Sequence, residues 1–311
     1  MENLHKSVLL TESLDHLDLK PNGIYIDATL GLGGHSEAIL NFGHDVRVVG
    51  IDQDLEAIEF AKERLGAFGE RFSVYHNNFS EIVEVANDAE LIEVDGIIAD
   101  LGVSSLQFDS ETRGFSFRFE APLDMRMDAD SEEETAAELL ERLSEEEIAN
   151  VIYEYGEERF SRRIARRIVE RRERGESIKT TGELADLVKR AIPRKGKDKI
   201  HPATKTFQAL RIAVNGELEI LEKFIEDSVE LLKTSGRLAV ITFHSLEDRI
   251  VKRTFQKLAG KCTCPPKFPI CVCGATKKIR IITRKPIIPE ESETFENPRA
   301  RSAKLRVCSK V

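Results

Sequence analysis

Three aspartates and a group of glycines are the residues of this sequence best suited to binding a ligand. Gly31, Gly33 and Gly34 follow a short apolar run, and a glycine loop lets a ligand lie against the backbone where a Cβ would block it. Asp27 precedes the loop. Asp52 follows the glycines by about 20 residues, the distance at which an acid meets ribose hydroxyls in nucleotide-binding βαβ units. The pattern therefore predicts an adenosine-containing ligand.

Two cofactors fit such a unit, and the loop favours one of them. A dinucleotide fingerprint needs a third glycine three residues after Gly33, where this chain has Ser36. S-adenosylmethionine enzymes have an acid at the end of the first strand, in the order acid-x-Gly-x-Gly-x-Gly. Asp27, Gly31 and Gly33 follow that order, with Thr29 in place of the first glycine. We therefore expect S-adenosylmethionine, and a strand–helix turn of another α/β enzyme is the alternative.

The elements that position these residues alternate between strand and helix. Strands are predicted over residues 24–27, 46–51, 72–75 and 95–100, with helices over 8–17, 36–42 and 55–65. This rhythm implies a parallel sheet with helices on both faces, in which ligands bind beyond the carboxyl ends of the strands. Asp27, Asp52, Phe79 and Asp100 all fall at those ends. We expect them to share one site.

The alternation stops after the fourth strand and resumes near the carboxyl end. Helical patterns cover residues 133–142, 144–155, 158–174 and 181–192; a helix over 217–233 and strands over 237–243, 278–283 and 303–308 follow. Seven strands are the number expected of a Rossmann-like class I methyltransferase, an α/β fold, here with an inserted all-helical domain. We place the methyltransferase domain at residues 1–112 and 216–311 and the inserted substrate-recognition domain at 113–215.

Composition and charge leave an RNA substrate open. The chain has 311 residues, 41% of them hydrophobic, and no apolar run approaches membrane length, so we expect a cytoplasmic protein with a sizeable core. A net charge of −9 argues against nucleic acid at first sight. Charge is uneven, however, and Arg159 to Arg174 is strongly basic. Taken alone, such a run is more often a solvated helix face.

Long blocks of the sequence resemble the bacterial RsmH (MraW) methyltransferases, which modify cytidine N4 in 16S rRNA. The blocks begin at His5, Asp27, Asp100, Arg113, Pro122, His201, Phe243 and Asn297, and they span nearly the whole chain. The resemblance implies cofactor contacts from Gly33, Gly34, His35, Asp52, Phe79, Asp100 and Gln107. We assign RNA contacts to Arg113, Asp124, His201, Lys205 and Arg211. The partner is then 16S rRNA, within the small ribosomal subunit; whether the protein forms a homodimer stays open.

The reaction that the resemblance implies asks for a hydrogen-bond acceptor near the amine. The N4 lone pair is delocalised into the cytosine ring, so an enzyme must align the amine and accept hydrogen bonds from it as charge develops. Asp100 is the predicted catalytic acceptor, and Asp124 is the alternative. The segment after Asp100 lacks the prolines and the aromatic of known amino-methyltransferases. No metal is needed, because the positive charge of a sulfonium already activates its leaving group.

Cysteines and histidines leave further alternatives. Cys262, Cys264, Cys271 and Cys273 form two C-x-C pairs, which suit zinc or reduced thiols about equally, and disulfides if the source is a hyperthermophile. His244 is interpreted as a structural residue. The competing functions are an NAD-dependent oxidoreductase, which Ser36 disfavours, a small-molecule methyltransferase, and a non-catalytic RNA-binding module. A small-molecule methyltransferase would not explain the basic helical insert, and a non-catalytic RNA-binding module would not explain the adenosine pocket.

Overall fold

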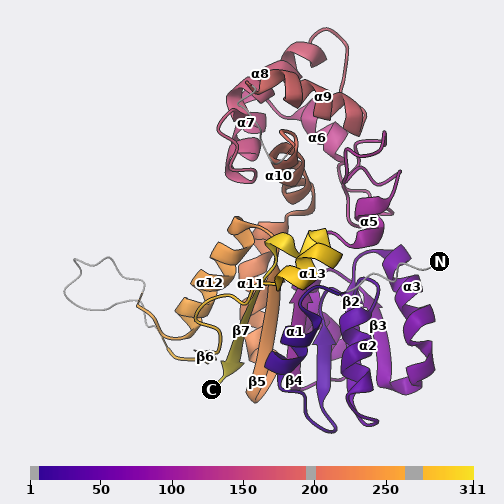
Figure 1. Cartoon of the computed structure of the whole chain (residues 1–311), viewed down its shortest axis with the longest axis vertical. Helices are drawn as coiled ribbons and strands as arrows, with labels where there is room; N and C mark the ends of the chain where they lie inside the picture. Colours follow the sequence, from indigo (N-terminus) through magenta and orange to yellow (C-terminus); the bar gives the residue numbers. More distant parts are fainter. Residues whose placement is uncertain (1–6, 194–200, 263–275) are drawn as a thin grey trace. The chain divides into compact units, whose positions relative to one another are not determined.

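A sheet unit and a helical unit make up the described chain. The computed structural model describes residues 7–193, 201–262 and 276–311. The sheet unit contains the residues up to Gly102 together with Leu218–Val311, and the helical unit contains Val103–Glu217 (Figure 1). The helical unit thus begins before residue 113, the boundary placed from the sequence. It includes α5 (Ser105–Asp109), where the Gln107 side chain donates a hydrogen bond to the carbonyl of Met127, 3.3 Å away.

A single mixed sheet of seven strands forms the centre of the sheet unit. In chain order the strands are β1 (Ile24–Asp27), β2 (Arg47–Asp52), β3 (Phe72–His76), β4 (Val94–Asp100), β5 (Leu232–Thr242), β6 (Ile279–Ile281) and β7 (Lys304–Lys310). Their order across the sheet is β3-β2-β1-β4-β5-β7-β6. The predicted α/β fold with seven strands is confirmed.

The last strand differs in direction from the parallel sheet that the sequence pattern implied. Strands β3, β2, β1, β4 and β5 are parallel, but β7 runs antiparallel to both β5 and β6. A parallel return needs a crossover of a dozen or more residues, usually a helix. The connection from β6 to β7 contains the short helix α13 (Glu291–Glu296) and a 3₁₀ turn (Pro298–Ser302) instead of a long crossover helix, and β7 pairs antiparallel with both of its neighbours.

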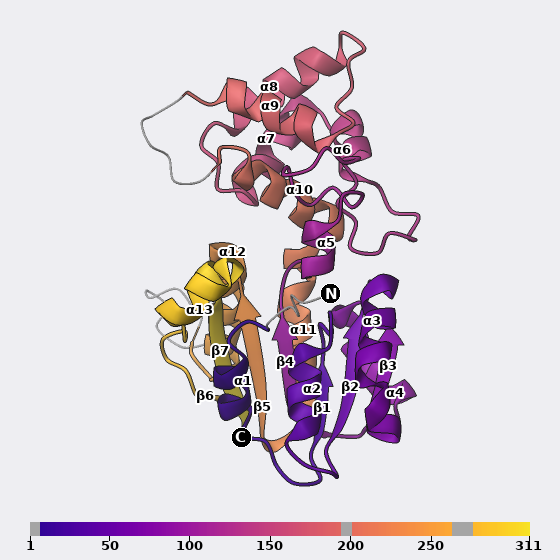
Figure 2. The same cartoon turned by 45° about the vertical axis from the view of Figure 1, so that its right-hand side comes forward.

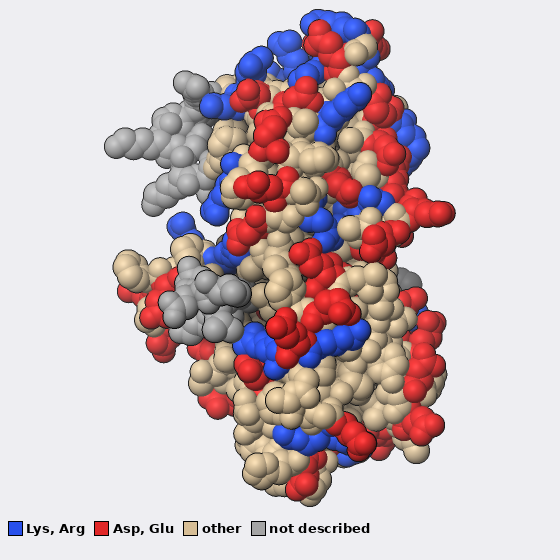
Figure 3. All heavy atoms as spheres, turned by 90° about the vertical axis from the view of Figure 1, so that its right-hand side faces the viewer, with Lys and Arg blue, Asp and Glu red and all other residues tan. Residues whose placement is uncertain are grey.

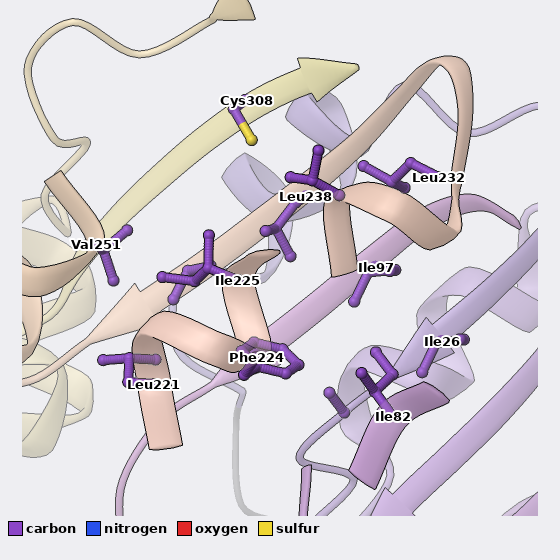
Figure 4. Packing of buried hydrophobic residues seen from close by; sticks show 14 of the residues in the cluster. Ile26, Ile82, Ile97, Leu221, Phe224, Ile225, Leu232, Leu238, Val251 and Cys308 are labelled. Carbon is purple, nitrogen blue, oxygen red and sulfur yellow. The ribbon is translucent and has the colours of Figure 1, made fainter. Parts of the chain in front are cut away.

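Helices cover both faces of this sheet. Successive strand residues point to opposite faces, so Ile26 and Ile97 enter one core while Tyr25 and Ile98 enter the other. Helices α4 (Ile82–Asp88), α11 (Glu217–Leu231) and α12 (Ser245–Leu258) pack on the first face, and α1 (Leu10–Leu17), α2 (Gly34–Asn41) and α3 (Leu55–Leu65) pack on the second (Figure 2). Phe224 of α11 lies at the centre of the first core (Figure 4).

The helical unit has its own core. Its helices α6 (Ala136–Arg142), α7 (Glu145–Glu154), α8 (Ser161–Arg172) and α9 (Thr181–Ala191) fall within the four predicted ranges, and α10 (Thr204–Asn215) follows. Three of them begin at capping boxes, Thr135 with Glu138, Ser144 with Glu147, and Thr180 with Glu183. Each box satisfies backbone amides that a helix start leaves open, and its sequence signature marks that start. Within the described ranges, no helix is both long and apolar enough to cross a membrane.

Candidate functional site

Three aspartates end three neighbouring strands of the sheet. Asp27 ends β1, Asp52 ends β2 and Asp100 ends β4, and β1 lies between the other two. Because these strands are parallel, their carboxyl ends meet at one edge (Figure 1). The structure therefore brings together the three acids that the sequence pattern placed there.

The Asp52 carboxylate holds the glycine loop. Its Oδ2 accepts a hydrogen bond from the Gly31 amide at 2.7 Å, and its Oδ1 accepts one from the Asp54 amide at 2.9 Å. Burial raises the pKa of Asp52 to about 6, against the opposing effect of these hydrogen bonds. Each carboxylate oxygen has a second lone pair. The side chain is thus fixed by the protein and keeps acceptor capacity for a ligand.

Asp27 is the most enclosed of the three acids. Its side chain is 1% exposed, and its Oδ2 accepts a hydrogen bond from the Ser36 hydroxyl at 2.7 Å. The Thr29 amide donates a longer bond, 3.4 Å, to Oδ1. Burial raises the pKa of Asp27 to about 6. Ser36, which breaks the dinucleotide pattern, thus has a structural role as the partner of this acid.

Asp100 has an acceptor oxygen that the described part of the chain does not use. Its Oδ1 is buried, and no hydrogen-bond donor among the described residues reaches it. Burial, followed by the charges of Asp27, Glu247 and Glu293, raises the pKa of Asp100 well above its ordinary value. The Asp100 amide donates to the Thr29 hydroxyl at 2.6 Å. Thr29, the departure from the glycine pattern, therefore ties β4 to the loop after β1.

Two glycines of the loop are required by the packing of the chain as well as by any ligand. Gly33 has φ of +75°, and a Cβ there would lie 2.9 Å from Cδ1 of Leu65. A Cβ on Gly34 would overlap the Ser7 hydroxyl. The sequence argument explained both glycines by the approach of a ligand alone. Packing against Leu65 and Ser7 is a second reason, which a local pattern could not reveal.

His35 and Phe79 occupy the positions expected of them in the sheet unit. His35 is the second residue of α2, where backbone amides have no partner within the helix. Its ring is buried, with Nε2 3.2 Å from the carbonyl oxygen of Val8, so the amide rather than the ring is suited to a ligand. Phe79 follows β3 and is half-buried. Its ring meets Phe224 edge to face, with centroids 5.0 Å apart.

Three predicted site residues have structural contacts in the loop of the helical unit. Gln107 and Arg113 are buried, and both donate to the carbonyl of Met127. Asp124 accepts two hydrogen bonds of 2.8 Å from the Arg126 guanidinium. Those bonds lower the pKa of Asp124 although burial opposes them. Asp124 would have to leave this ion pair before it accepted a proton, which weakens it as the alternative to Asp100.

The other three residues assigned to RNA binding differ in whether their side chains are exposed or held in an ion pair. Arg211 forms a bidentate pair with Glu217, with N–O distances of 2.7 and 2.8 Å. Lys205 is exposed and donates to the carbonyl of Glu157. His201 is exposed and stacks on Phe117, with ring centroids 4.5 Å apart. Sequence reasoning missed the Arg211–Glu217 pair, although both charges were visible six positions apart.

The basic run divides into structural and available arginines. Arg172 donates to the carbonyls of Leu140, Glu141 and Leu143 and so caps the end of α6. Arg162 and Arg163 are exposed, and no ion pair or hydrogen bond of their side chains occurs within the described part of the chain. On the face drawn in Figure 3, basic and acidic side chains are mixed. The run is thus neither wholly a solvated face nor a continuous basic patch.

The remaining histidine and cysteine interpretations have unequal outcomes. His244 is the N-cap of α12, and its Nδ1 accepts a hydrogen bond from the Glu247 amide at 3.4 Å. This geometry agrees with a structural role. Cys262 is exposed, but Cys264, Cys271 and Cys273 lie outside the described residues, so the question of zinc, disulfides or thiols stays open.

Comparison with known proteins identifies the family. A model of the MraW methylase family matches residues 2–311. A Clostridium botulinum protein (strain Kyoto / Type A2) is named ribosomal RNA small subunit methyltransferase H. It is 53% identical over 312 residues, and the match covers 100% of this chain and 100% of that protein. A Halothermothrix orenii protein of the same name is 53% identical over 309 residues, covering 99% of this chain and 98% of that protein. The chain belongs to the MraW methylase family.

Proposed function

We propose that this protein transfers a methyl group from S-adenosylmethionine to 16S rRNA of the small ribosomal subunit, at the exocyclic N4 of a cytidine in the decoding region. Membership of the family and the name shared by the relatives support methylation of small-subunit rRNA. The observation that carries the proposal is the meeting of Asp27, Asp52 and Asp100 at one sheet edge beside the glycine loop. The choice of N4 rests on the resemblance of the sequence.

The residues at this edge fit S-adenosylmethionine. Asp52 keeps acceptor lone pairs for ribose hydroxyls, and the first amides of α2, including that of His35, suit a carboxylate. Phe79 offers a flat apolar ring beside which a base can stack. Asp27, Asp52 and Asp100 all have raised pKa values, so they favour a ligand that carries positive charge, since such a ligand offsets the cost of ionising them. When bound, this cofactor supplies a methyl group that its sulfonium charge has already activated.

Asp100 is the residue proposed to act on the substrate amine. Its buried Oδ1 has acceptor capacity, and the Thr29 hydroxyl fixes its backbone. A carboxylate held in this way accepts hydrogen bonds from an amine as positive charge develops on the nitrogen. Asp124 is less suited, because Arg126 occupies both of its oxygens.

The helical unit is proposed to bind the RNA through its exposed basic side chains. Among the described residues, the side chains of Arg162 and Arg163 have no ion pair or hydrogen bond and can neutralise phosphates, whereas Arg172 is bound to three carbonyls. Charge reversal at Arg162 and Arg163 is expected to weaken RNA binding and reduce its salt dependence, because fewer counterions are released. Affinity for S-adenosylmethionine should not change. The control is Lys62→Glu, which reverses one exposed charge of the sheet unit that pairs with Glu59. Equal RNA affinity in both variants and the wild type would leave these arginines as a solvated face.

The direct test of the proposed function is nucleoside mass spectrometry of 16S rRNA from cells with and without the protein. We expect one N4-methylated cytidine to be lost without the protein and restored by the wild type but not by Asp100→Asn. Purified protein should then be offered naked 16S rRNA and small subunits as alternative substrates. An unchanged modification pattern would contradict the proposal. Methylation of a small molecule alone would favour the hypothesis of a small-molecule methyltransferase.

A further inference from the structure

The start of the described chain lies against the glycine loop. Residues 7–9 form the N-terminal strap. Its Ser7 packs so closely on Gly34 that a Cβ there would overlap the Ser7 hydroxyl, and the Val8 carbonyl lies 3.2 Å from Nε2 of His35. Gly34 and His35 are the first two residues of α2. The strap therefore contacts both residues of the start of α2.

The strap itself is held in an unfavourable conformation. Leu9 has φ of +51° and ψ of +36°, the left-handed region that costs residues other than glycine roughly 1–2 kcal/mol. Such a conformation persists only where the surroundings enforce it. The Leu9 side chain is fully buried in the second core of the sheet unit, which supplies one restraint.

Glu293 supplies the other restraint from the opposite end of the chain. Its Oε1 accepts a hydrogen bond of 2.8 Å from the Leu9 amide, across 284 positions of sequence. Leu9 is the N-cap of α1, and no side chain of its own helix caps that start. Glu293 belongs to α13, which follows β6 and precedes β7. After burial and the charges of Asp27 and Glu247, the charge of Glu293 also helps to raise the pKa of Asp100.

We infer that Glu293 is a positioning residue. By accepting a hydrogen bond from the Leu9 amide, it holds the N-terminal strap against Gly34 and His35, and the strap in turn fixes the first turn of α2 for the cofactor. This inference rests on the proposed function for the identity of the ligand. It assigns to α13 a role that neither the glycine loop nor the three strand-end aspartates perform.

Three variants test the inference. Glu293→Ala removes the acceptor, Glu293→Gln retains an acceptor oxygen without the charge, and Glu291→Ala removes an exposed acid from the same helix as a matched control. Amide hydrogen exchange at Leu9 reports on the strap, and calorimetry reports on S-adenosylmethionine binding. Thermal unfolding establishes that each variant is folded.

We expect Glu293→Ala to accelerate exchange at Leu9 and to weaken cofactor binding, each by about tenfold, which corresponds to the loss of one hydrogen bond to a charged group. Glu293→Gln should stay within about threefold of the wild type in both measurements, and Glu291→Ala should match the wild type. Weaker cofactor binding in Glu293→Ala with unchanged Leu9 exchange would overturn the inference, as would no change in either. Failure of the wild type to bind the cofactor would instead contradict the proposed function.

Discussion

Replacing Asp52 by asparagine tests whether its charge binds the cofactor. The substitution keeps the size of the side chain and removes its ionisation. If the ionised carboxylate accepts hydrogen bonds from the ribose, its loss should weaken S-adenosylmethionine binding at pH 8 by about 1.5–3 kcal/mol, the range for hydrogen bonds to a charged group. This corresponds to about tenfold to a hundredfold in the dissociation constant.

The pKa of about 6 gives this prediction a pH dependence. At pH 8 the wild-type carboxylate is ionised, whereas at pH 5, about one unit below its pKa, only about a tenth of it is. The advantage of the wild type over Asp52→Asn should therefore shrink by about tenfold between pH 8 and pH 5. Titration of the ligand affects both proteins and cancels in the ratio of their dissociation constants.

Calorimetry at pH 5, 6, 7 and 8 measures that ratio, with Asp88→Asn at an exposed position of the same unit as control. An asparagine oxygen cannot accept as many bonds as two carboxylate oxygens, so the Gly31 or Asp54 amide loses its partner, at a cost of about 1–3 kcal/mol in stability. Thermal unfolding must show that the variant is folded at each pH. A ratio that stays constant with pH would refute the role of the charge, and equal affinities would remove Asp52 from the site.

Three further predictions concern other residues. Asp100→Asn should lower turnover by a larger factor than cofactor affinity in paired kinetic and calorimetric measurements; an equal fall in both would make Asp100 a cofactor ligand only. Burial raises the pKa of Asp27 from 3.8 to about 6, so the folded state binds the proton more tightly, and about 3 kcal/mol of stability present below pH 4 should be lost as the pH rises through 6. Asp27→Asn should flatten that part of the curve of unfolding free energy against pH, and an unaltered curve would contradict the shift. Arg172→Ala should lower the unfolding free energy by about 2 kcal/mol, because three carbonyls at the end of α6 lose a charged donor, whereas Arg163→Ala should not; denaturant unfolding compares the two.

Much of the sheet unit was predictable from local pattern. Strand β1 and helix α3 have the bounds that the sequence predicted, and Asp27 and Asp100 end the strands expected of them. Apolar runs of strand length between helical patterns specify a βαβ rhythm. That rhythm alone sends the carboxyl ends of parallel strands to one edge. The direction of β7 was not predictable in this way, since it depends on which neighbour the strand pairs with.

The sequence by itself also determined the family, because long blocks in one order carry that information without any contact being known. Only the tertiary structure decided which charged residues are available. The sequence assigned RNA contacts to Asp124 and Arg211, yet the side chain of each is held in an ion pair. The bond from Leu9 to Glu293 joins residues that are 284 positions apart. Side-chain pairing of this kind depends on distances in the folded chain, which the spacing of residues along the sequence does not specify.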